Sequence, residues 1–305
     1  SGAFLTSLWK YAGQHHLFTG PGPILGENGQ RFRTRQMQIV PEPLSGILKY
    51  DTQRDFAMKH HTPPEFHTKP VYIELAGAGA TGSLILAGLV RLHLAMLELG
   101  HPHGLRVRCW DPDTISHANI GRQLFVESEI GRNKAVTLIT RYNYHFGLDW
   151  SAKPERFSPD QYCNSGNLIV ISAVDSRKSR AEISAANREY PKAYWIDCGC
   201  GLDYGQVFCG NGSPELPYPW VKHPELIDVT QDNPNRSSCS MADSLEHHGL
   251  FINQFIATGV LEFVWQLFRN GGLDYSELYF NIKTGRMMPV MIELPEKQEI
   301  KCNAA

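Results

Sequence analysis

The stretch Val71–Gly82, VYIELAGAGATG, decides how the chain is organised. Its first half, Val71–Ala76, is short and apolar, as expected for a buried strand. Gly77, Gly79 and Gly82 then form the pattern G-x-G-x-x-G, and apolar residues follow at helical spacing. A strand, a glycine turn and a helix in this order are typical of a nucleotide site, because glycine lets a phosphate approach backbone N–H groups at the helix start. The stretch does not identify the nucleotide, and a glycine turn without a ligand is the alternative.

Strand and helix patterns alternate along the chain after residue 71. Alternation of this kind favours a parallel sheet with helices packed on its faces. The expected fold class is therefore α/β, a Rossmann-like, doubly wound, mainly parallel sheet with helices on both faces. Predicted strands are Val71–Ala76, Leu105–Trp110, a segment within 165–173, Tyr194–Asp197 and Gln206–Cys209, with a closing hairpin of Leu278–Lys283 and Met287–Ile292. Predicted helices are Thr81–Leu99, Ile130–Phe146, Arg177–Tyr190 and Asp243–Asn270.

Residues 1–70 differ in character from the rest of the chain. They are rich in Gly, Pro, His and Gln and contain few periodic segments. We expect residues 1–70 to be an N-terminal extension and residues 71–305 to form one domain. His60–Pro64, with its paired histidines and prolines, is predicted to be a linker into the first strand.

Composition limits the classes of function. Hydrophobic residues make up 42% of the 305 residues and charged residues 20%, as in an ordinary globular protein. The net charge of -2 offers no basic excess for nucleic acid. No apolar run reaches the roughly 20 residues that span a bilayer, and the first residues lack the pattern of a secretion signal, so no membrane partner is expected. The 7 cysteines lack framework spacing, which favours free thiols and a cytoplasmic location.

A polar segment follows the second predicted strand, at the edge where open sheets bind ligands. It reads DPDTISHANIGRQ from Asp111 to Gln123, and IGRNK from Ile130 to Lys134 comes next. Asp175 stands at the end of the third predicted strand. A carboxylate after the second strand is well placed to bind ribose hydroxyls. Its separation from the glycines, however, is longer than the roughly 20 residues typical of dinucleotide enzymes.

Together with the glycine loop GAGATG, the segments DPDTISHANIGRQ, IGRNK and SAVDSR resemble the ThiF/MoeB family of ubiquitin-activating-type adenylating enzymes. The likeness covers about residues 71–270, and the four motifs occur in the family's order. The segments GRQLF, FGLDW and FINQ are similar to ThiF-like proteins of the bacterial PRTRC gene system. The resemblance implies the ThiF/MoeB adenylation fold, ATP and Mg²⁺ as cofactors, and a ubiquitin-like small protein as substrate.

The resemblance assigns the chemistry to three charged side chains. Arg122 would bind two phosphate oxygens at once, Lys134 would neutralise the α-phosphate region, and Asp175 would bind Mg²⁺. A helix N-cap is the alternative role for Asp175. The residues expected to bind the nucleotide are Gly77, Gly79, Thr81, Gly82, Asp111, Asp113, Asn119 and Gln123.

Two further residues follow from the resemblance. The family supplies an N-terminal arginine to the ATP of the neighbouring subunit in a homodimer, and Arg35, in RFRTRQ, is the candidate here. Cys239, in NRSSCSM, stands where the family carries a cysteine that forms a thioester. Arg236 and a nearby helix start would favour its thiolate. An unreactive loop cysteine is the alternative.

The expected function is therefore adenylation of the C-terminal glycine carboxylate of a ubiquitin-like protein, followed by a thioester on Cys239 and a conjugating-enzyme-like protein as a further partner. An NAD-dependent oxidoreductase is one alternative, because the glycine loop and Asp111 allow it. Such an enzyme would leave Arg122, Lys134 and Asp175 without a role. A non-catalytic ThiF-like module that binds a nucleotide or a partner is the other, and it is favoured by Ser176 and Ala118, which depart from the family pattern.

Overall fold

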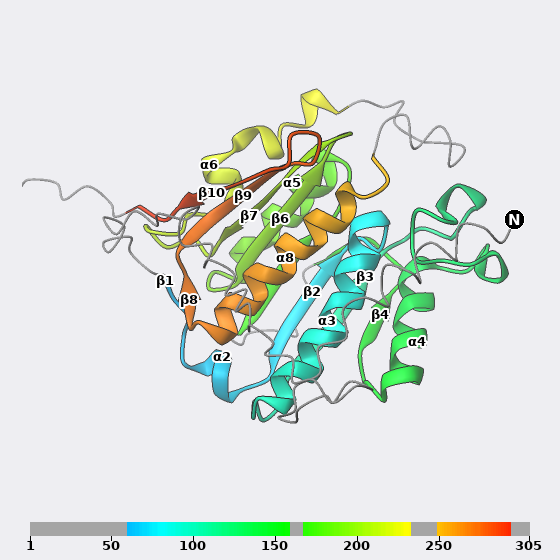
Figure 1. The fold of residues 1–305 in the computed structure, drawn as a ribbon, viewed down its shortest axis with the longest axis horizontal. Helices are drawn as coiled ribbons and strands as arrows, with labels where there is room; N and C mark the ends of the chain where they lie inside the picture. The colour runs from blue at the N-terminus through cyan, green and yellow to red at the C-terminus, as the bar shows by residue number, and fades with distance from the viewer. Residues whose placement is uncertain (1–59, 159–166, 233–248, 294–305) are drawn as a thin grey trace, which may run out of the picture. The chain divides into compact units, whose positions relative to one another are not determined.

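The computed structural model describes residues 60–158, 167–232 and 249–293, all within the second of two compact units of the chain, residues 53–305. The centre of this unit is an eight-stranded sheet with the strand order β10-β9-β7-β6-β5-β2-β3-β4 (Figure 1). The five strands from β6 to β4 are parallel, and β7, β9 and β10 pair antiparallel. The predicted α/β class with a mainly parallel sheet is confirmed.

The parallel strands are wound outward from β2 in both directions. From β2 the chain runs to β3 and β4 on one side, and then returns to β5 and β6 on the other side. This reversal beside β2 creates a crevice at the carboxyl ends of the strands, which is where open α/β sheets bind ligands. The strands are β2 Val71–Ala76, β3 Leu105–Trp110, β4 Ser151–Lys153, β5 Leu168–Ser172 and β6 Tyr194–Cys200.

Antiparallel strands complete the sheet beyond β6. Strand β7 (Tyr204–Gly210) folds back along β6, and the hairpin of β9 (Tyr275–Asn281) and β10 (Arg286–Met291) pairs with β7 through β9. The closing hairpin is therefore present as predicted. Gly285, with a φ of +65°, lies in its turn.

A second, two-stranded sheet brings residues from the predicted extension into the folded unit. Strand β1 (His60–His61) pairs antiparallel with β8 (Gly272–Leu273), and the short helix α2 (Glu65–Thr68) follows. Phe66 of α2 is completely buried in the main core. The prediction of a linker at His60–Pro64 is therefore wrong, because the backbone of β1 is used for pairing.

Helices cover both faces of the sheet. Helices α3 (Ala80–Glu98), α4 (Lys134–Phe146) and α8 (Ile252–Arg269) pack on one face, and α5 (Arg177–Ala185) and α6 (Pro219–Lys222) on the other. Each face of the sheet has its own hydrophobic core, and successive residues of β5 belong alternately to one core and the other. This explains why all of LIVIS is apolar or buried. The described 3₁₀ turns are η3 His117–Asn119, η4 Glu127–Glu129, η5 Ala186–Arg188, η6 Pro224–Leu226 and η7 Val229–Gln231.

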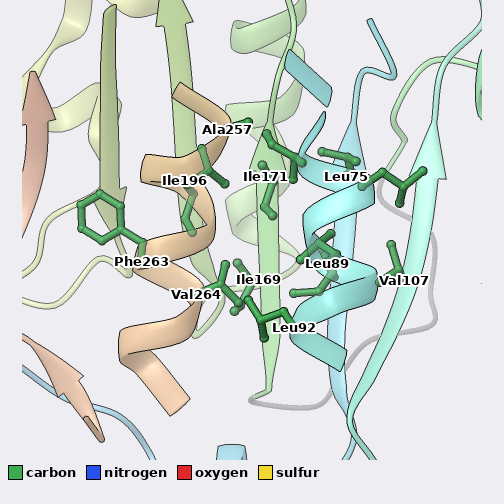
Figure 2. Packing of buried hydrophobic residues seen from close by; sticks show 14 of the residues in the cluster. Leu75, Leu89, Leu92, Val107, Ile169, Ile171, Ile196, Ala257, Phe263 and Val264 are labelled. Carbon is green, nitrogen blue, oxygen red and sulfur yellow. The ribbon is translucent and has the colours of Figure 1, made fainter. Parts of the chain in front are cut away.

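The larger core lies beneath α3 and α8, which run side by side across the sheet (Figure 2). Leu89 of α3 and Phe263 and Val264 of α8 are fully buried there against the strands. A Cβ at Gly88 would lie 2.0 Å from the Cδ1 of Leu261, so glycine lets the two helices approach closely. This packing fixes the starts of both helices at the carboxyl end of the sheet.

Helix α3 is the one helix in the described ranges that is long and apolar enough, by composition, to cross a membrane. Half of its apolar window is nevertheless buried inside the protein. Ile85, Leu86 and Leu89 are fully enclosed between the sheet and the neighbouring helices. The apolar character of α3 is therefore explained by its place in the core.

Several predicted element ends differ from the structure for local reasons. Helix α4 begins at Lys134 rather than at Ile130, because Gly131 has a φ of +84° and the side chain of Asn133 caps the helix through the N–H of Val136. Helix α5 ends at Ala185, five residues short of the predicted Tyr190, and β6 continues past Asp197 to Cys200. Strand β4 was not predicted. The predicted start of the last helix, Asp243, lies outside the described residues.

Candidate functional site

The carboxyl ends of β2, β3, β5 and β6 open into a cleft of about 970 Å³. Ten of the thirteen site residues predicted from the sequence line this cleft. They are Gly77, Gly79, Thr81, Asp111, Asp113, Asn119, Arg122, Gln123, Lys134 and Asp175. Gly82 lies behind the glycine turn, and Arg35 and Cys239 lie outside the described residues. The structure therefore brings together residues that are up to about 100 positions apart in the sequence, because parallel strands end at one edge.

Two of the three glycines shape the loop, and the third leaves it open. Gly77 has a φ of +98°, and a Cβ there would lie 2.5 Å from the carbonyl oxygen of Ala173 on the neighbouring segment. A Cβ at Gly82 would lie 1.9 Å from the carbonyl oxygen of Gly77. At Gly79, by contrast, a Cβ would have no neighbour within 4 Å. The backbone at Gly79 is therefore accessible from the cleft.

Asp111, at the end of β3, is bonded to the glycine loop. Its Oδ2 accepts a hydrogen bond from the N–H of Ala78 at 2.6 Å, and its Oδ1 accepts one from the N–H of Asp113 at 2.8 Å. Burial raises the pKa of Asp111, and these hydrogen bonds oppose the rise. Each oxygen keeps a further lone pair, so the carboxylate can still accept a hydroxyl from a ligand.

Lys134 is held at the side of the cleft by an ion pair. Its Nζ lies 2.8 Å from Oδ2 of Asp113, and the Lys134 side chain is 10% exposed whereas that of Asp113 is 64% exposed. The amide of Asn133 donates to the carbonyl oxygens of Asp111 at 2.7 Å and Asp113 at 3.1 Å. These bonds tie the start of α4 to the loop after β3, and so fix the position of the ammonium group.

The turn around η3 presents a buried donor and a buried acceptor to the cleft. Nε of Arg122 and Oε1 of Gln123 are both buried without a hydrogen-bond partner. Burial lowers the pKa of Arg122, and the neighbouring Cys200 opposes this effect. The oxygen of Asn119 is already used, because it accepts from the N–H and the hydroxyl of Ser116 at 2.9 and 3.2 Å. Unsatisfied buried groups in a cleft indicate a ligand that completes them.

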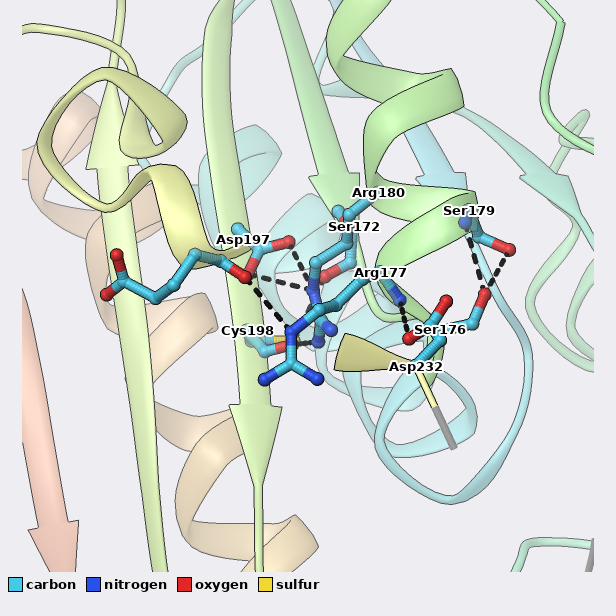
Figure 3. A network of polar contacts seen from close by, with 9 residues as sticks. Ser172, Ser176, Arg177, Ser179, Arg180, Asp197, Cys198 and Asp232 are labelled. Carbon is cyan, nitrogen blue, oxygen red and sulfur yellow. Dashed lines mark hydrogen bonds and ion pairs between the residues drawn. The ribbon is translucent and has the colours of Figure 1, made fainter. Parts of the chain in front are cut away.

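Asp175 lies exposed in the wall of the cleft, after β5. Ser176, not Asp175, is the N-cap of α5, and its hydroxyl accepts from the N–H of Ser179 at 3.1 Å. The carboxylate of Asp232 accepts from the N–H group of Arg177 at 2.8 Å (Figure 3). It also accepts from the N–H group of Lys178 at 2.9 Å. The N-cap alternative for Asp175 is therefore wrong, and its carboxylate is left to the cleft.

A buried ion pair joins α5 to β6 behind the cleft. Nε of Arg180 lies 3.0 and 3.2 Å from the two oxygens of Asp197, and its second amino group donates to the carbonyl oxygen of Cys198 at 2.9 Å (Figure 3). Burial alone would lower the pKa of Arg180, but Asp197 raises it overall. Burial raises the pKa of Asp197 against the opposing effect of Arg180. Asp197 faces α5, whereas Cys198 and Cys200 belong to the core on the opposite face.

The sequence pattern of the ThiF family matches residues 67–302, well over half of the chain. The chain belongs to the ThiF family. The fold is thus of the E1-like adenylyltransferase type, as the motif order predicts. No curated protein matches the sequence significantly. Among solved structures, the crystal structure of selenomethionine PaaA is similar, with a TM-score of 0.50 and 16% identity, over 73% of this chain and 65% of that chain. The match spans less than two thirds of that PaaA chain, and it shows the fold alone.

In this ThiF-family chain, two cleft residues were missed by sequence reasoning. Cys200 is partly exposed and lines the cleft from the end of β6. Asn253 was hidden within a predicted apolar helix, but it lines the cleft from the first turn of α8. A polar residue at the start of an otherwise apolar helix was the available signal. The likeness to PRTRC proteins stays a prediction.

The remaining wall of the ThiF-family cleft is aromatic. Tyr204, Phe208 and Tyr279, from β7 and β9, line it beyond β6. The ring of His223 stacks on Phe208 with 4.3 Å between centroids, and the hydroxyl of Tyr279 donates to Oε2 of Glu277 at 2.9 Å. These residues extend the cleft away from the glycine loop and form an aromatic floor there.

Metal binding in the cleft would depend on few protein ligands. Within the described residues, no group of three or more His, Cys, Asp or Glu side chains is arranged to hold a metal ion. Asp175 contributes an exposed carboxylate to the cleft wall. Mg²⁺ is commonly bound in this way, by one or two carboxylates together with phosphate oxygens and water. The donor set therefore fits Mg²⁺ delivered with a polyphosphate.

Proposed function

We propose that the protein uses ATP to adenylate the C-terminal glycine carboxylate of a small ubiquitin-like protein. The observation that supports this most directly is the buried, unpartnered Nε of Arg122 in the same cleft as Gly79 and Lys134. A guanidinium, an ammonium and accessible backbone N–H groups together suit a chain of phosphates. Membership of the ThiF family favours adenylation over the hydride transfer of an NAD-dependent oxidoreductase.

The nucleoside end of ATP has suitable partners on the side of the cleft at β3. The unpartnered Oε1 of Gln123 and the spare lone pairs of Asp111 are acceptors, and ribose hydroxyls and the adenine amino group are donors. Trp110 and Phe157 line the same side, with 5.5 Å between their ring centroids. Aromatic rings provide an apolar surface for a base.

In the proposed reaction, a carboxylate oxygen of the substrate attacks the α-phosphorus of ATP. The bond from that phosphorus to the bridging oxygen breaks, and pyrophosphate leaves with the electron pair. Negative charge builds on the phosphoryl oxygens, so catalysis depends on positioning and on neutralising charge. Arg122 would bind two of these oxygens. Lys134, held in place by Asp113, would supply the second positive charge.

Asp175 is the residue proposed to hold Mg²⁺. The ion would neutralise part of the charge on the phosphates when it is bound. The carboxylate of Asp175 has no helix-capping duty, because Ser176 and Asp232 perform that task for α5. Its exposure in the cleft wall is therefore consistent with a role toward the ligand.

The substrate tail is proposed to enter along the aromatic floor. An extended chain that ends in glycine could pass over Tyr204 and Phe208 and bring its carboxylate toward the glycine loop. The absence of a side chain on glycine would let the carboxylate approach the α-phosphate closely. The homodimer, the conjugating-enzyme-like partner, Arg35 and the thioester on Cys239 are further proposals from the family resemblance.

ATP–pyrophosphate exchange tests the proposal. The protein is incubated with Mg-ATP, labelled pyrophosphate and candidate small β-grasp proteins that end in Gly-Gly. Exchange that depends on one of them is expected. Arg122→Gln should reduce it about 10- to 150-fold, because a hydrogen bond to a charged group contributes about 1.5–3 kcal/mol. Arg132→Gln is the matched control, since Arg132 is exposed on the same segment and does not line the cleft.

The outcomes separate three functions. Loss of exchange in Arg122→Gln but not in Arg132→Gln supports adenylation. Tight ATP binding without exchange, whichever protein is added, would instead favour a non-catalytic binding module. Binding of NADH in place of ATP, with hydride transfer, would refute the proposal in favour of an oxidoreductase.

A further inference from the structure

Cys200, at the end of β6, belongs to a small polar cluster that opens into the cleft. Its Sγ donates to Oδ1 of Asn253 at 3.3 Å, and the hydroxyl of Thr81 donates to the same oxygen at 2.9 Å. The three residues come from β6, α3 and α8, and all line the cleft. The cluster therefore lies at the point where three elements end or begin.

The surroundings of this cluster favour negative charge. Thr81 and Asn253 are each the second residue of their helix, and neither α3 nor α8 has a side-chain cap at its N-terminus. The uncapped N–H groups and helix dipoles place partial positive charge at both starts. Arg122 lines the same cleft and adds a full positive charge to it. The two helix starts and this cation would favour a thiolate at Cys200.

The cluster also lacks a partner that a ligand would provide. Asn253 is only 4% exposed, and its Nδ2 makes no hydrogen bond, although its oxygen accepts two. Nε of Arg122 is unpartnered as well. Leaving a buried amide N–H₂ unpaired is costly, so an oxygen atom is expected opposite it when the site is filled. Because Nδ2 of Asn253 lies on the residue that contacts the Cys200 thiol, the carbonyl oxygen of an acyl group attacked by that thiol would suit this place.

We propose that the thiol of Cys200 accepts the acyl group within the adenylation cleft, and that Asn253 binds the carbonyl oxygen during the transfer. The inference rests on the proposed function, because adenylation supplies the activated acyl group. Its substrate class is the acyl-adenylate of a glycine-terminated chain. It differs from the family-based expectation, which assigns the thioester to Cys239.

The step balances without a further reactant. The thiol loses its proton to water, and the thiolate sulfur of Cys200 attacks the carbonyl carbon of the acyl-adenylate. A C–S bond forms, and the carbonyl electron pair moves to the oxygen, where Nδ2 of Asn253 donates a hydrogen bond. The carbonyl re-forms as the C–O bond to the phosphate breaks. AMP leaves with that electron pair, and a thioester remains on Cys200.

The other cysteines in the described ranges do not suit this role. Cys109, Cys198 and Cys209 are buried, and burial raises the pKa of all three thiols. Sγ of Cys198 donates to the carbonyl oxygen of Ser172 at 3.3 Å, in the interior of the sheet. Cys198 and Cys200 both line the cleft, but Cys200, two residues further along the same strand, is the one of these four that is partly exposed. The buried three serve as internal controls.

Thiol–thioester exchange tests the thiol without requiring ATP. The full chain with Cys239→Ser is mixed with a synthetic peptide ending in Gly-Gly as its mercaptoethanesulfonate thioester. After an acid quench and peptic digestion, the acylated cysteine is located by mass. Acylation of Cys200 is expected, and Asn253→Asp should slow it about tenfold or more, because the variant keeps the acceptor oxygen but removes both donors. A melting curve of this variant reports whether the fold is kept.

The proposal and the proposed function can fail separately. Acylation confined to cysteines other than Cys200 would overturn the assignment, as would an equal rate in a folded Asn253→Asp protein. With the unmodified chain, Mg-ATP and a substrate that supports pyrophosphate exchange, a thioester on Cys200 supports the complete sequence of steps. A thioester on Cys239 alone would overturn it while leaving adenylation intact. The protein could also be acylated by the synthetic thioester and yet show no ATP–pyrophosphate exchange with any substrate. That result would remove the source of the acyl group and refute both proposals.

Discussion

Replacing Arg180 by methionine should destabilise the protein strongly, because it leaves the carboxylate of Asp197 buried without its cation. The side chains of Arg180 and Asp197 are 13% and 8% exposed, so solvent screens their interaction weakly. Removing one partner of a buried ion pair costs about 3–5 kcal/mol. For a folded unit of this size, that corresponds to a fall of roughly 6–20 °C in melting temperature.

The effect should depend on pH in a defined direction. Burial already raises the pKa of Asp197 in the folded protein, and loss of Arg180 removes the charge that opposes this rise. A raised pKa in the folded state means that stability is lost as the pH rises from the unfolded pKa through the folded one. The penalty of Arg180→Met should therefore be smallest in mild acid and grow toward neutral pH.

Circular dichroism melts at pH 5 and pH 8 measure this difference directly. Arg180→Met combined with Asp197→Asn is the matched control, because the double variant removes the buried charge together with its partner. It should recover much of the lost stability and most of the pH dependence should disappear. A single variant that melts within about 2 °C of the unmodified protein at pH 8, or a double variant that is worse than the single one, would refute the reasoning.

Two other predictions concern the glycine loop and the start of α5. Gly82→Ala should destabilise the protein by about 1–3 kcal/mol in urea unfolding, because its Cβ would lie 1.9 Å from the carbonyl oxygen of Gly77. Gly79→Ala should keep the stability but weaken binding of a fluorescent ATP analogue, since its Cβ meets open space; equal stability losses in both variants would contradict the assignment. Asp232→Ala should lower the melting temperature at pH 7 and much less in strong acid. The N–H groups of Arg177 and Lys178 lower the pKa of Asp232, so its contribution is present above the unfolded pKa and is lost as pH falls through the folded one. A pH-independent difference would argue against this cap.

The sequence was sufficient where a single local signal dominated. Strands β2 and β3 have the predicted bounds. Strand β2 is a short, mainly apolar run that ends at a glycine turn, and β3 alternates apolar residues with arginines and ends at an aspartate. The order of polar motifs after these strands was enough to place ten site residues around one cleft, since parallel strands end at the same edge. The family assignment is confirmed by the match over residues 67–302.

Features that depend on distant partners could not be read from the sequence. Strand β1 is two residues long and exists because β8, more than 200 positions later, pairs with it. The pairing of Arg180 with Asp197 depends on how α5 packs against β6. Asn253 lies within a predicted helix, and its place beside Cys200 depends on the packing of α8 on α3. The predicted helix starting at Ile130 failed because the conformation of Gly131 outweighed the apolar spacing.

The length of β6 is tightly restricted, because the side chains on its two faces have different roles. Asp197 contacts α5 on one side, while Cys198 and Cys200 turn to the other, because successive side chains of a strand alternate. Adding one residue to the strand before Asp197 would exchange the faces, sending a carboxylate into the apolar layer under α8 and the cleft thiol toward α5. An insertion of two residues would restore the alternation. Natural relatives with a longer β6 should therefore have gained residues there in pairs. Relatives that gained a single residue should have lost both the carboxylate of Asp197 and the thiol of Cys200.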